Sequence, residues 1–411
     1  MRRLLIAALL GALVVPASAH ADAVTDGNAN AVSALVTSAG QSPTVSTVHL
    51  AMVHGAVYDA VNSIDGRHDA YLVDVRARRW YSRDAAAATA AYRVLLGIVP
   101  AQQATLAAQY DRSLAAIPAG PAKSGGIAVG EITAAAMLTA RMGDGRFGTY
   151  RFPAPANPAD PWPAGQWRPV LPAFVNDPAA WMKDVRPFII ADPARYASRG
   201  PDPLTSRRYA REFDEVKSLG SATSTTRTPD QTDQARFWAE GPQPWTRVAR
   251  QLVVDRGLSS ADSARMFAQL YMAGADTIIS VWTDKARWLC WRPITAIREA
   301  ASDGNPDTAP DVGWTPLINT PPYPDQPSGL SSVSAAMAET LDATFGRHVR
   351  FSITSLSSNT TRTFDSFDDA VDEVVDARVA AGIHFRKADE DGATIGRRVS
   401  RHVLASGFER D

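Results

Sequence analysis

The chain has 411 residues, of which 45% are hydrophobic, and its 42 Lys and Arg nearly balance its 43 Asp and Glu. This length supports one large globular domain or two ordinary ones. The net charge of -1 argues against a partner recognised by overall charge, such as a nucleic acid or an anionic membrane surface. Cys290 is the only cysteine, so an internal disulfide is excluded and we expect a buried, inert thiol.

The first residues are typical of a secretory signal. Arg2 and Arg3 precede an apolar stretch from Leu4 to Val15, and small residues follow it. The sequence therefore predicts a signal peptide over residues 1–21, a secreted mature chain and no transmembrane segment in that chain. An uncleaved N-terminal anchor is the less favoured alternative, because the apolar run is short for a bilayer.

Helical patterns dominate the mature chain. Residues 45–150 contain alanine-rich helical segments, the first of which is expected to end just before Gly66. Residues 151–204 are dense in proline and aromatic residues; we interpret them as a segment that wraps the core, with a substrate lid as the alternative. Residues 205–411 return to helical patterns and carry the motifs described below.

Local signals place two helix starts in this last part. Thr228 to Gln231, with the sequence TPDQ, is typical of a capping box with proline at the first helical position. Ser259 to Asp262 is typical of a second helix cap. We find no convincing pair of strands, so we predict one all-α domain over residues 22–411, built as a helical bundle.

Two pairs of polar residues mark the candidate site. Lys285 and Arg292 are seven residues apart, which places them on one face if a helix continues until Pro293 ends or kinks it. Arg378 and His384 are six apart, and a turn at the intervening Gly382 would bring the histidine back toward the arginine.

Between these pairs lies the sequence Pro327-Ser328-Gly329 at an expected helix start, where backbone N–H groups and a hydroxyl can face an anion. Each feature alone has an ordinary structural explanation, such as a solvated face or a common turn. Together they provide two arginines, a lysine, a serine, backbone amides and an imidazole, which suit a tetrahedral oxyanion. Without an anion, buried cations would repel by roughly 4 kcal/mol for each pair near 4 Å.

The order of these motifs resembles the vanadium-dependent haloperoxidases, which share a superfamily with type 2 phosphatidic acid phosphatases and bacterial acid phosphatases. The resemblance rests on Lys285 with Arg292-Pro293, then Pro-Ser-Gly, then Arg378 with His384. The upstream sequences HGAVYDAVNSID and GQWRP are similar to the exported bacterial branch. The resemblance implies an all-α fold with a four-helix core around the oxyanion.

The resemblance also implies a role for each matched residue. His384 would be the axial group, which coordinates vanadate in the peroxidases and becomes phosphorylated in the phosphatases. The other matched residues would contact the oxyanion: Lys285, Arg292, Ser328, Gly329 and Arg378.

One position departs from the family pattern. The turn is normally Pro-Ser-Gly-His, but this chain has Leu330 in place of the histidine that acts as general acid/base. Loss of such a group typically costs about a hundredfold to ten-thousandfold in rate. Ala388 also replaces an acid found four residues after the axial histidine, and we suggest Asp389 or Asp391 as the group that orients His384 instead.

Three functions follow from this sequence. The first is a secreted vanadium-dependent peroxidase that oxidises a halide or a small organic substrate with hydrogen peroxide. The second is an acid phosphatase that forms a phosphohistidine at His384, with phosphate in place of vanadate. The third is a non-catalytic protein that binds an oxyanion. His49, His54 and His402 are the alternative proton donors in the sequence, and we expect them to be structural. The sequence leaves the oligomeric state open.

Overall fold

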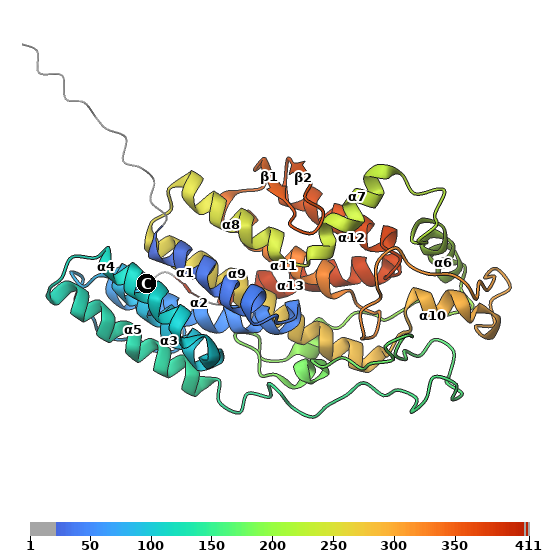
Figure 1. The fold of residues 1–411 in the computed structure, drawn as a ribbon, viewed down its shortest axis with the longest axis horizontal. Helices are drawn as coiled ribbons and strands as arrows, with labels where there is room; N and C mark the ends of the chain where they lie inside the picture. The colour runs from blue at the N-terminus through green and yellow to red at the C-terminus, as the bar shows by residue number, and fades with distance from the viewer. Residues whose placement is uncertain (1–21, 407, 410–411) are drawn as a thin grey trace, which may run out of the picture.

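The computed structural model describes residues 22–406 and 408–409, and the predicted signal peptide lies outside them. The described residues form thirteen α-helices, several short 3₁₀ or π segments and one two-stranded sheet (Figure 1). This architecture confirms the predicted all-α class. Within the described part of the chain, no helix has both the length and the apolar character needed to cross a bilayer.

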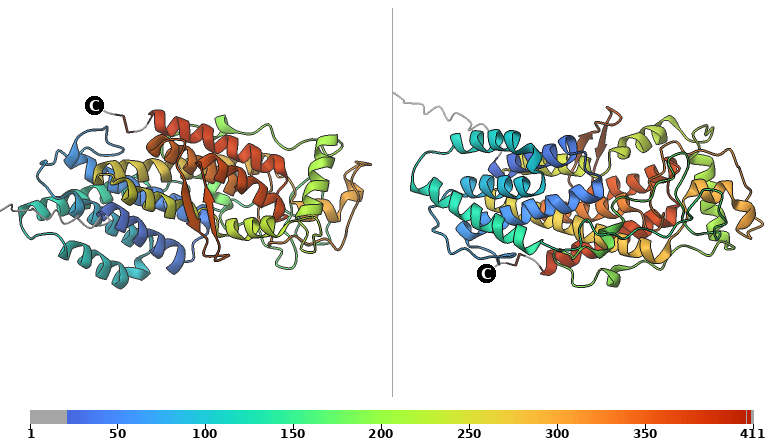
Figure 2. Two further views of the ribbon diagram at one scale, coloured as in Figure 1. Left: turned by 90° about the horizontal axis from the view of Figure 1, so that it is seen from above. Right: turned by 60° about the horizontal axis from the view of Figure 1, so that its bottom comes forward.

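The N-terminal helices form a layered group at one end of the molecule (Figures 1 and 2). Helix α3 packs against α1, α2 and α5. The predicted end of the first long helix is confirmed, because α2 ends at Asp65 and Gly66 takes the left-handed conformation with φ 64°. The helices are α1 (Ala23–Val32), α2 (Pro43–Asp65), α3 (Arg83–Ile98), α4 (Gln103–Ala115) and α5 (Pro121–Ala140), and a π segment covers Ser33–Ser38.

The proline-rich segment between α5 and α6 runs along the outside of the molecule (Figures 1 and 2). Apart from the 3₁₀ turns Ala180–Asp184 and Pro193–Tyr196, it has no helix in the described chain. Its Trp167 and Trp181 are buried in the core. The segment therefore wraps the helices, as the favoured interpretation expects.

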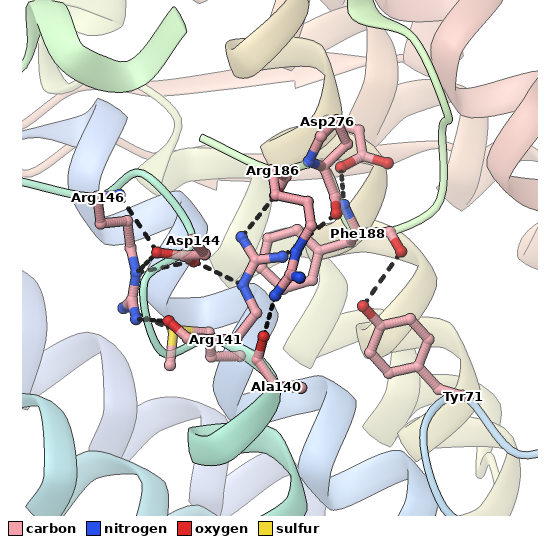
Figure 3. Close-up of polar contacts among 10 residues, drawn as sticks. Tyr71, Ala140, Arg141, Asp144, Arg146, Arg186, Phe188 and Asp276 are labelled. Carbon is pink, nitrogen blue, oxygen red and sulfur yellow. Dashed lines mark hydrogen bonds and ion pairs between the residues drawn. The ribbon is translucent and has the colours of Figure 1, made fainter. Parts of the chain in front are cut away.

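Buried polar contacts attach this segment to the helices (Figure 3). The Asp276 carboxylate accepts hydrogen bonds from the backbone N–H groups of three consecutive residues, Phe188, Ile189 and Ile190, at 2.6, 2.8 and 2.9 Å. Arg141 donates to the carbonyl oxygen of Arg186 at 2.7 Å. We call Asp276 and the three N–H groups it binds the Asp276 clamp.

The C-terminal helices contain the predicted site motifs. Helix α9 is shared by both ends of the molecule, because it packs against α2 on one side and against α11 and α13 on the other. The predicted caps at Thr228 and Ser259 are confirmed. The helices are α6 (Arg207–Leu219), α7 (Pro229–Phe237), α8 (Gln243–Arg256), α9 (Ser260–Trp288), α10 (Pro293–Arg298), α11 (Gly329–Phe345), α12 (Phe367–Ala380) and α13 (Arg386–Ser406).

Helices α11 and α13 approach closely through glycine. A Cβ atom on Gly392 of α13 would lie 2.5 Å from the carbonyl oxygen of Ser328, and one on Gly396 would overlap the carbonyl oxygen of Ser332. The absence of side chains at these positions lets the start of α13 lie against the start of α11. This contact places the sequence after His384 beside the Pro-Ser-Gly turn.

A short antiparallel sheet was not predicted. Strand β1 (Phe351–Thr354) pairs with β2 (Thr361–Phe364), with Phe351 opposite Phe364. The expectation of no strand pair was wrong because the strands are only four residues long. The alternation of buried Phe351 and Ile353 with exposed Ser352 and Thr354 in β1 was the available signal, whereas β2 shows no such alternation.

Candidate oxyanion-binding site

Lys285 and Arg292 reach the site from different elements. Helix α9 ends at Trp288, and Leu289 adopts a left-handed conformation whose N–H donates to the Lys285 carbonyl oxygen at 2.9 Å. Arg292 is the N-cap residue of α10, and Pro293 is the first residue of that helix. The prediction that one helix carries both cations was therefore wrong. Pro293 starts a new helix because its missing N–H is not needed at that position.

Both cations nevertheless contact the same backbone turn. Lys285 Nζ donates to the carbonyl oxygens of Pro324 and Asp325 at 2.7 and 3.0 Å. Arg292 Nε donates to the carbonyl oxygen of Tyr323 at 2.8 Å. The Tyr323 ring lies against both cations, 5.1 Å from Lys285 Nζ and 4.8 Å from Arg292 Cζ.

Burial lowers the tendency of Lys285 to carry its charge. Lys285 and Arg292 have no exposed surface. Loss of hydration, with a smaller contribution from the positive charge of Arg292, lowers the pKa of Lys285 well below its ordinary value. A nearby anion would favour the charged form of Lys285 and oppose this effect.

His384 lies in the same buried region. The left-handed turn at Gly382, with φ 78°, separates α12 from α13 as predicted. His384 Nδ1 lies 2.7 Å from Asp325 Oδ1, and His384 Nε2 lies 3.1 Å from Arg292 Nη1. Burial, followed by the positive charges of Arg292, Arg378 and Lys285, lowers the pKa of His384 well below its ordinary value, which keeps the imidazole neutral.

Asp325 belongs to the site but was not predicted from the sequence. The suggestion that Asp389 or Asp391 orients His384 was wrong. Asp389 accepts a hydrogen bond from the Ser331 hydroxyl at 2.7 Å, and Asp391 accepts one from Gln326 at 2.6 Å. An acid two residues before Pro327 in the motif was the available signal, but it precedes His384 by 59 positions in sequence, so only the fold reveals the contact.

Ser328 and Gly329 form the start of α11. Ser328 is the N-cap residue and is fully buried, and its backbone N–H donates to the Ala388 carbonyl oxygen at 2.7 Å. Its hydroxyl lies 3.3 Å from that of Ser331. A Cβ atom on Gly329 would lie 3.2 Å from the Trp282 ring, so only glycine fits here without displacing that ring.

Arg378 completes the predicted set from the last turn of α12. It is 7% exposed, and burial lowers its pKa while Asp389 opposes that shift. Among the described residues, Arg378 Nε and Arg292 Nη2 have no hydrogen-bond partner. Buried polar groups are normally satisfied, so these two unpartnered N–H groups make the cluster incomplete.

An apolar cavity of about 210 Å³ borders this cluster, and we call it the Leu330 cavity. Gly329, Leu330 and Arg378 lie on its wall, next to Trp282 and Tyr323. Within the described chain, Tyr323 and Arg378 are the only titratable residues of that wall, so it holds no group that exchanges protons near neutral pH.

The three histidines considered as proton donors, His49, His54 and His402, do not belong to this cavity wall. His49 Nδ1 contacts Gln41 at 2.8 Å, and His54 Nε2 contacts Asn28 at 2.8 Å. Burial lowers the pKa of each to about 3. His402 packs edge-on against Tyr196. These contacts agree with the structural roles expected for the three histidines.

The sequence of the C-terminal helices is similar to that of known proteins. Residues 265–408 match the family described as the VCPO second helical-bundle domain. A vanadium chloroperoxidase from Curvularia inaequalis is 28% identical over an alignment of 175 residues, and the match covers 36% of this chain and 28% of that protein. The alignment therefore spans little more than a quarter of that relative's length.

The solved structures extend the likeness over most of the fold. A bacterial vanadium-dependent iodoperoxidase matches with a TM-score of 0.80 and 22% identity, covering 94% of this chain and 97% of the other. A bacterial vanadium-dependent chloroperoxidase in its holo form matches with a TM-score of 0.70 and 18% identity, covering 89% and 94%. The comparisons thus confirm the resemblance to the vanadium-dependent haloperoxidases, in sequence over the second helical bundle and in fold over nearly the whole chain.

Proposed function

We propose that this chain is a secreted, vanadate-binding peroxidase that uses hydrogen peroxide to oxidise a halide or a small organic molecule. The observation that carries the proposal is the buried cluster of Lys285, Arg292 and Arg378 around a neutral histidine, with two guanidinium N–H groups left unpartnered. The named relatives are vanadium-dependent peroxidases, which supports vanadate over phosphate as the oxyanion.

The residues present fit an oxyanion with several negative oxygens. Arg292 Nη2 and Arg378 Nε are buried donors that lack an acceptor among the described residues. Together with Lys285, the Ser328 hydroxyl and the Gly329 N–H at the start of α11, they would hold vanadate by charge-assisted hydrogen bonds. Bound vanadate activates hydrogen peroxide for the transfer of an oxygen atom.

His384 and Asp325 have separate parts in this proposal. The Asp325 carboxylate, 2.7 Å from His384 Nδ1, favours the tautomer with the proton on Nδ1. That tautomer makes Nε2 the acceptor nitrogen of the ring. Arg292 Nη1 now lies 3.1 Å from it, and bound vanadate would take this lone pair in place of that contact. His384 would therefore be the vanadate ligand, and Asp325 a positioning residue.

Leu330 determines which reactions should be fast. Oxidation of a halide X⁻ by hydrogen peroxide consumes one proton and forms HOX and water. A leucine side chain cannot supply that proton, and the cavity wall holds no alternative donor near neutral pH among the described residues. We expect slow halide oxidation for this reason.

Titration of the full-length chain with vanadate, followed by calorimetry and ⁵¹V NMR, tests the proposal. Arg378→Ala should weaken vanadate binding roughly tenfold to a hundredfold, because it removes hydrogen bonds to a charged group. The matched control is Arg350→Ala, which removes a positive charge from an exposed side chain and should leave the affinity unchanged.

Activity assays then distinguish the alternatives. Vanadate-dependent consumption of hydrogen peroxide supports the peroxidase. Hydrolysis of an aryl phosphate with a trapped phosphohistidine at His384 would establish the phosphatase instead. Tight binding of either anion without turnover of peroxide or phosphate ester would establish an oxyanion-binding protein and overturn the proposed catalysis.

A further inference from the structure

A second cavity, of about 310 Å³, shares no wall residue with the Leu330 cavity, and we call it the Tyr209 cavity. The wrapping segment contributes residues 201–204 to its wall, and α6 contributes Tyr209. The connection between α9 and α10 contributes Cys290 and Trp291. Asp325, which contacts His384, also belongs to this wall. The Tyr209 cavity therefore borders the positioning residue of the oxyanion site but is separate from the Leu330 cavity.

Most of the wall is apolar, and one side of it lies at the surface. Trp291 and Phe385 contribute aromatic side chains, and the Phe385 ring centre lies 5.6 Å from that of Tyr209. Pro201 and Pro203 are exposed, so a ligand can enter beside the wrapping segment. Because an apolar cavity of roughly 150 Å³ can hold benzene, a cavity of twice that volume suits a molecule with two fused rings.

Two buried donors on this wall lack an acceptor. The Tyr209 hydroxyl and the Trp291 indole nitrogen have no hydrogen-bond partner among the described residues, and the two residues are 6% and 1% exposed. Burial raises the pKa of the Tyr209 phenol well above its ordinary value, so the hydroxyl keeps its proton. The neighbouring Trp291 cannot accept that proton, because an indole N–H only donates. Since buried donors are normally satisfied, the cavity lacks a hydrogen-bond acceptor.

The charged residues of the wall argue against an anionic ligand. Within the described part of the chain, the wall carries the carboxyl groups of Asp202, Glu212 and Asp325 and the ammonium group of Lys387. Lys387 Nζ is already paired with Asp391 at 2.9 Å. Each of the three carboxyl groups also has an arginine or a histidine as a partner inside the protein, so a cation is not required. The missing acceptor is therefore expected on a neutral molecule, such as a ketone or an amide.

We propose that the Tyr209 cavity is a second ligand site, which binds a neutral two-ring organic molecule whose carbonyl oxygen accepts the hydrogen bond of Tyr209. The apolar wall contacts the rings, and the hydroxyl selects the carbonyl group. The inference goes beyond the proposed peroxidase function and does not depend on vanadate, because the described wall contains none of the residues proposed to hold the oxyanion.

The ketone α-tetralone is a suitable probe, and tetralin is the same two-ring skeleton without the carbonyl group. Indole signals of the ¹⁵N-labelled full-length chain, recorded without vanadate, locate each ligand. Trp291 lines the Tyr209 cavity, whereas Trp238 and Trp282 line the Leu330 cavity, and single Trp→Phe variants assign the three signals. We expect a saturable shift of the Trp291 signal with α-tetralone, and about threefold to tenfold weaker binding of tetralin. The naphthoate anion should bind at least about tenfold more weakly than α-tetralone.

Tyr209→Phe tests the proposed hydrogen bond, because it removes only the hydroxyl. This variant should bind α-tetralone about threefold to tenfold more weakly than the wild type does, and about as weakly as it binds tetralin. Tyr150→Phe is the matched control. Tyr150 is partly buried and belongs to neither cavity wall, so its variant should keep the wild-type preference for the ketone.

A cavity-filling variant tests the location independently of Tyr209. Leu204→Trp adds bulk at a partly exposed position on the wall, and both two-ring ligands should bind about tenfold more weakly. Val312→Trp is its control, because Val312 is 82% exposed and outside both walls, and it should change neither affinity.

The failure of this inference differs from the failure of the proposed function. An unchanged Trp291 signal, or shifts confined to Trp238 and Trp282, would overturn the ligand site. Equal wild-type affinities for α-tetralone and tetralin would overturn the role of the Tyr209 hydroxyl. Binding of α-tetralone at Trp291 without vanadate binding would overturn the proposed function and leave the second site, and the reverse result would do the opposite.

Discussion

Two buried polar clusters in this molecule differ in how their charges are satisfied. In the Asp276 clamp, the carboxylate accepts three backbone N–H groups and holds the wrapping segment against α9; Figure 3 shows the contact with Phe188. Nine residues further along the same helix, Lys285 lies beside Arg292, whose Nη2 has no partner among the described residues. The hydrogen-bonding groups of the Asp276 clamp are all paired within the protein, whereas the second cluster includes a buried N–H group that has no acceptor.

This difference separates a structural cluster from a candidate binding site. Burial alone does not distinguish the two kinds of cluster, because Asp276 and Lys285 are both fully buried. The pKa of Asp276 is raised to about 6 by burial, so a perturbed acid is also present in the structural cluster. Unsatisfied donors beside a cavity are the feature that points to a ligand.

The largest effect should come from His384→Ala. This variant removes the lone pair proposed to bind vanadium. Vanadate-dependent turnover should fall by more than about a hundredfold, which exceeds the loss typical of removing a residue that only hydrogen-bonds to a metal ligand. Steady-state peroxide consumption and ⁵¹V NMR measure the change. Retention of wild-type turnover and of the vanadium signal would show that the incomplete cluster does not use this imidazole.

Leu330→His should act in the opposite direction. The new imidazole would border the cavity next to the oxyanion cluster and could supply the missing proton, so bromide oxidation should rise by up to about a hundredfold. Bromide oxidation is followed against pH, with Leu330→Gln as a polar control that cannot exchange protons. Equal gains in both variants would argue against an acid/base effect.

Asp325→Asn tests the positioning residue. Loss of the carboxylate next to His384 Nδ1 should weaken vanadate binding about tenfold to a hundredfold, as is typical when a residue that hydrogen-bonds to a metal ligand is removed. The specific readout is the ¹⁵N NMR spectrum of His384, in which the proton should no longer be confined to Nδ1. A purely structural role would lower stability while leaving the tautomer unchanged.

Asp276→Asn should have the smallest effect on function. An asparagine amide places a donor toward backbone N–H groups, so the free energy of unfolding at pH 7 should fall by about 2 kcal/mol. Denaturant titration measures this loss, and vanadate affinity should stay within twofold. A large loss of affinity with intact folding would mean that the clamp and the oxyanion site are coupled along α9.

The clamp also has a pH signature. Because the folded protein raises the pKa of Asp276 from 3.8 to about 6, it binds this proton more tightly than the unfolded chain does. The stabilisation from that proton is complete below pH 4 and is lost as the pH rises through 6. Asp276→Asn should lack this fall between pH 4 and 6, which unfolding curves at several pH values would show.

Local patterns in the sequence predicted much of the helical framework. The caps at Thr228 and Ser259 and the glycine end at Gly66 depend on hydrogen bonds within a few residues, so the sequence alone indicates them. The three site motifs were likewise recognisable from residue type and spacing. The short sheet escaped prediction because its pairing is weakly specified by four residues on each strand.

Tertiary structure decided how the motif residues meet. The left-handed Leu289 ends α9 and delivers Arg292 from a loop, which spacing on an ideal helix could not show. The contact between Asp325 and His384, and the cavity beside Leu330, combine segments far apart in the chain. Sequence determined which chemical groups are available. Long-range packing determined which of them are paired and which remain free to bind an anion, because burial and hydrogen bonding depend on neighbours that spacing does not reveal.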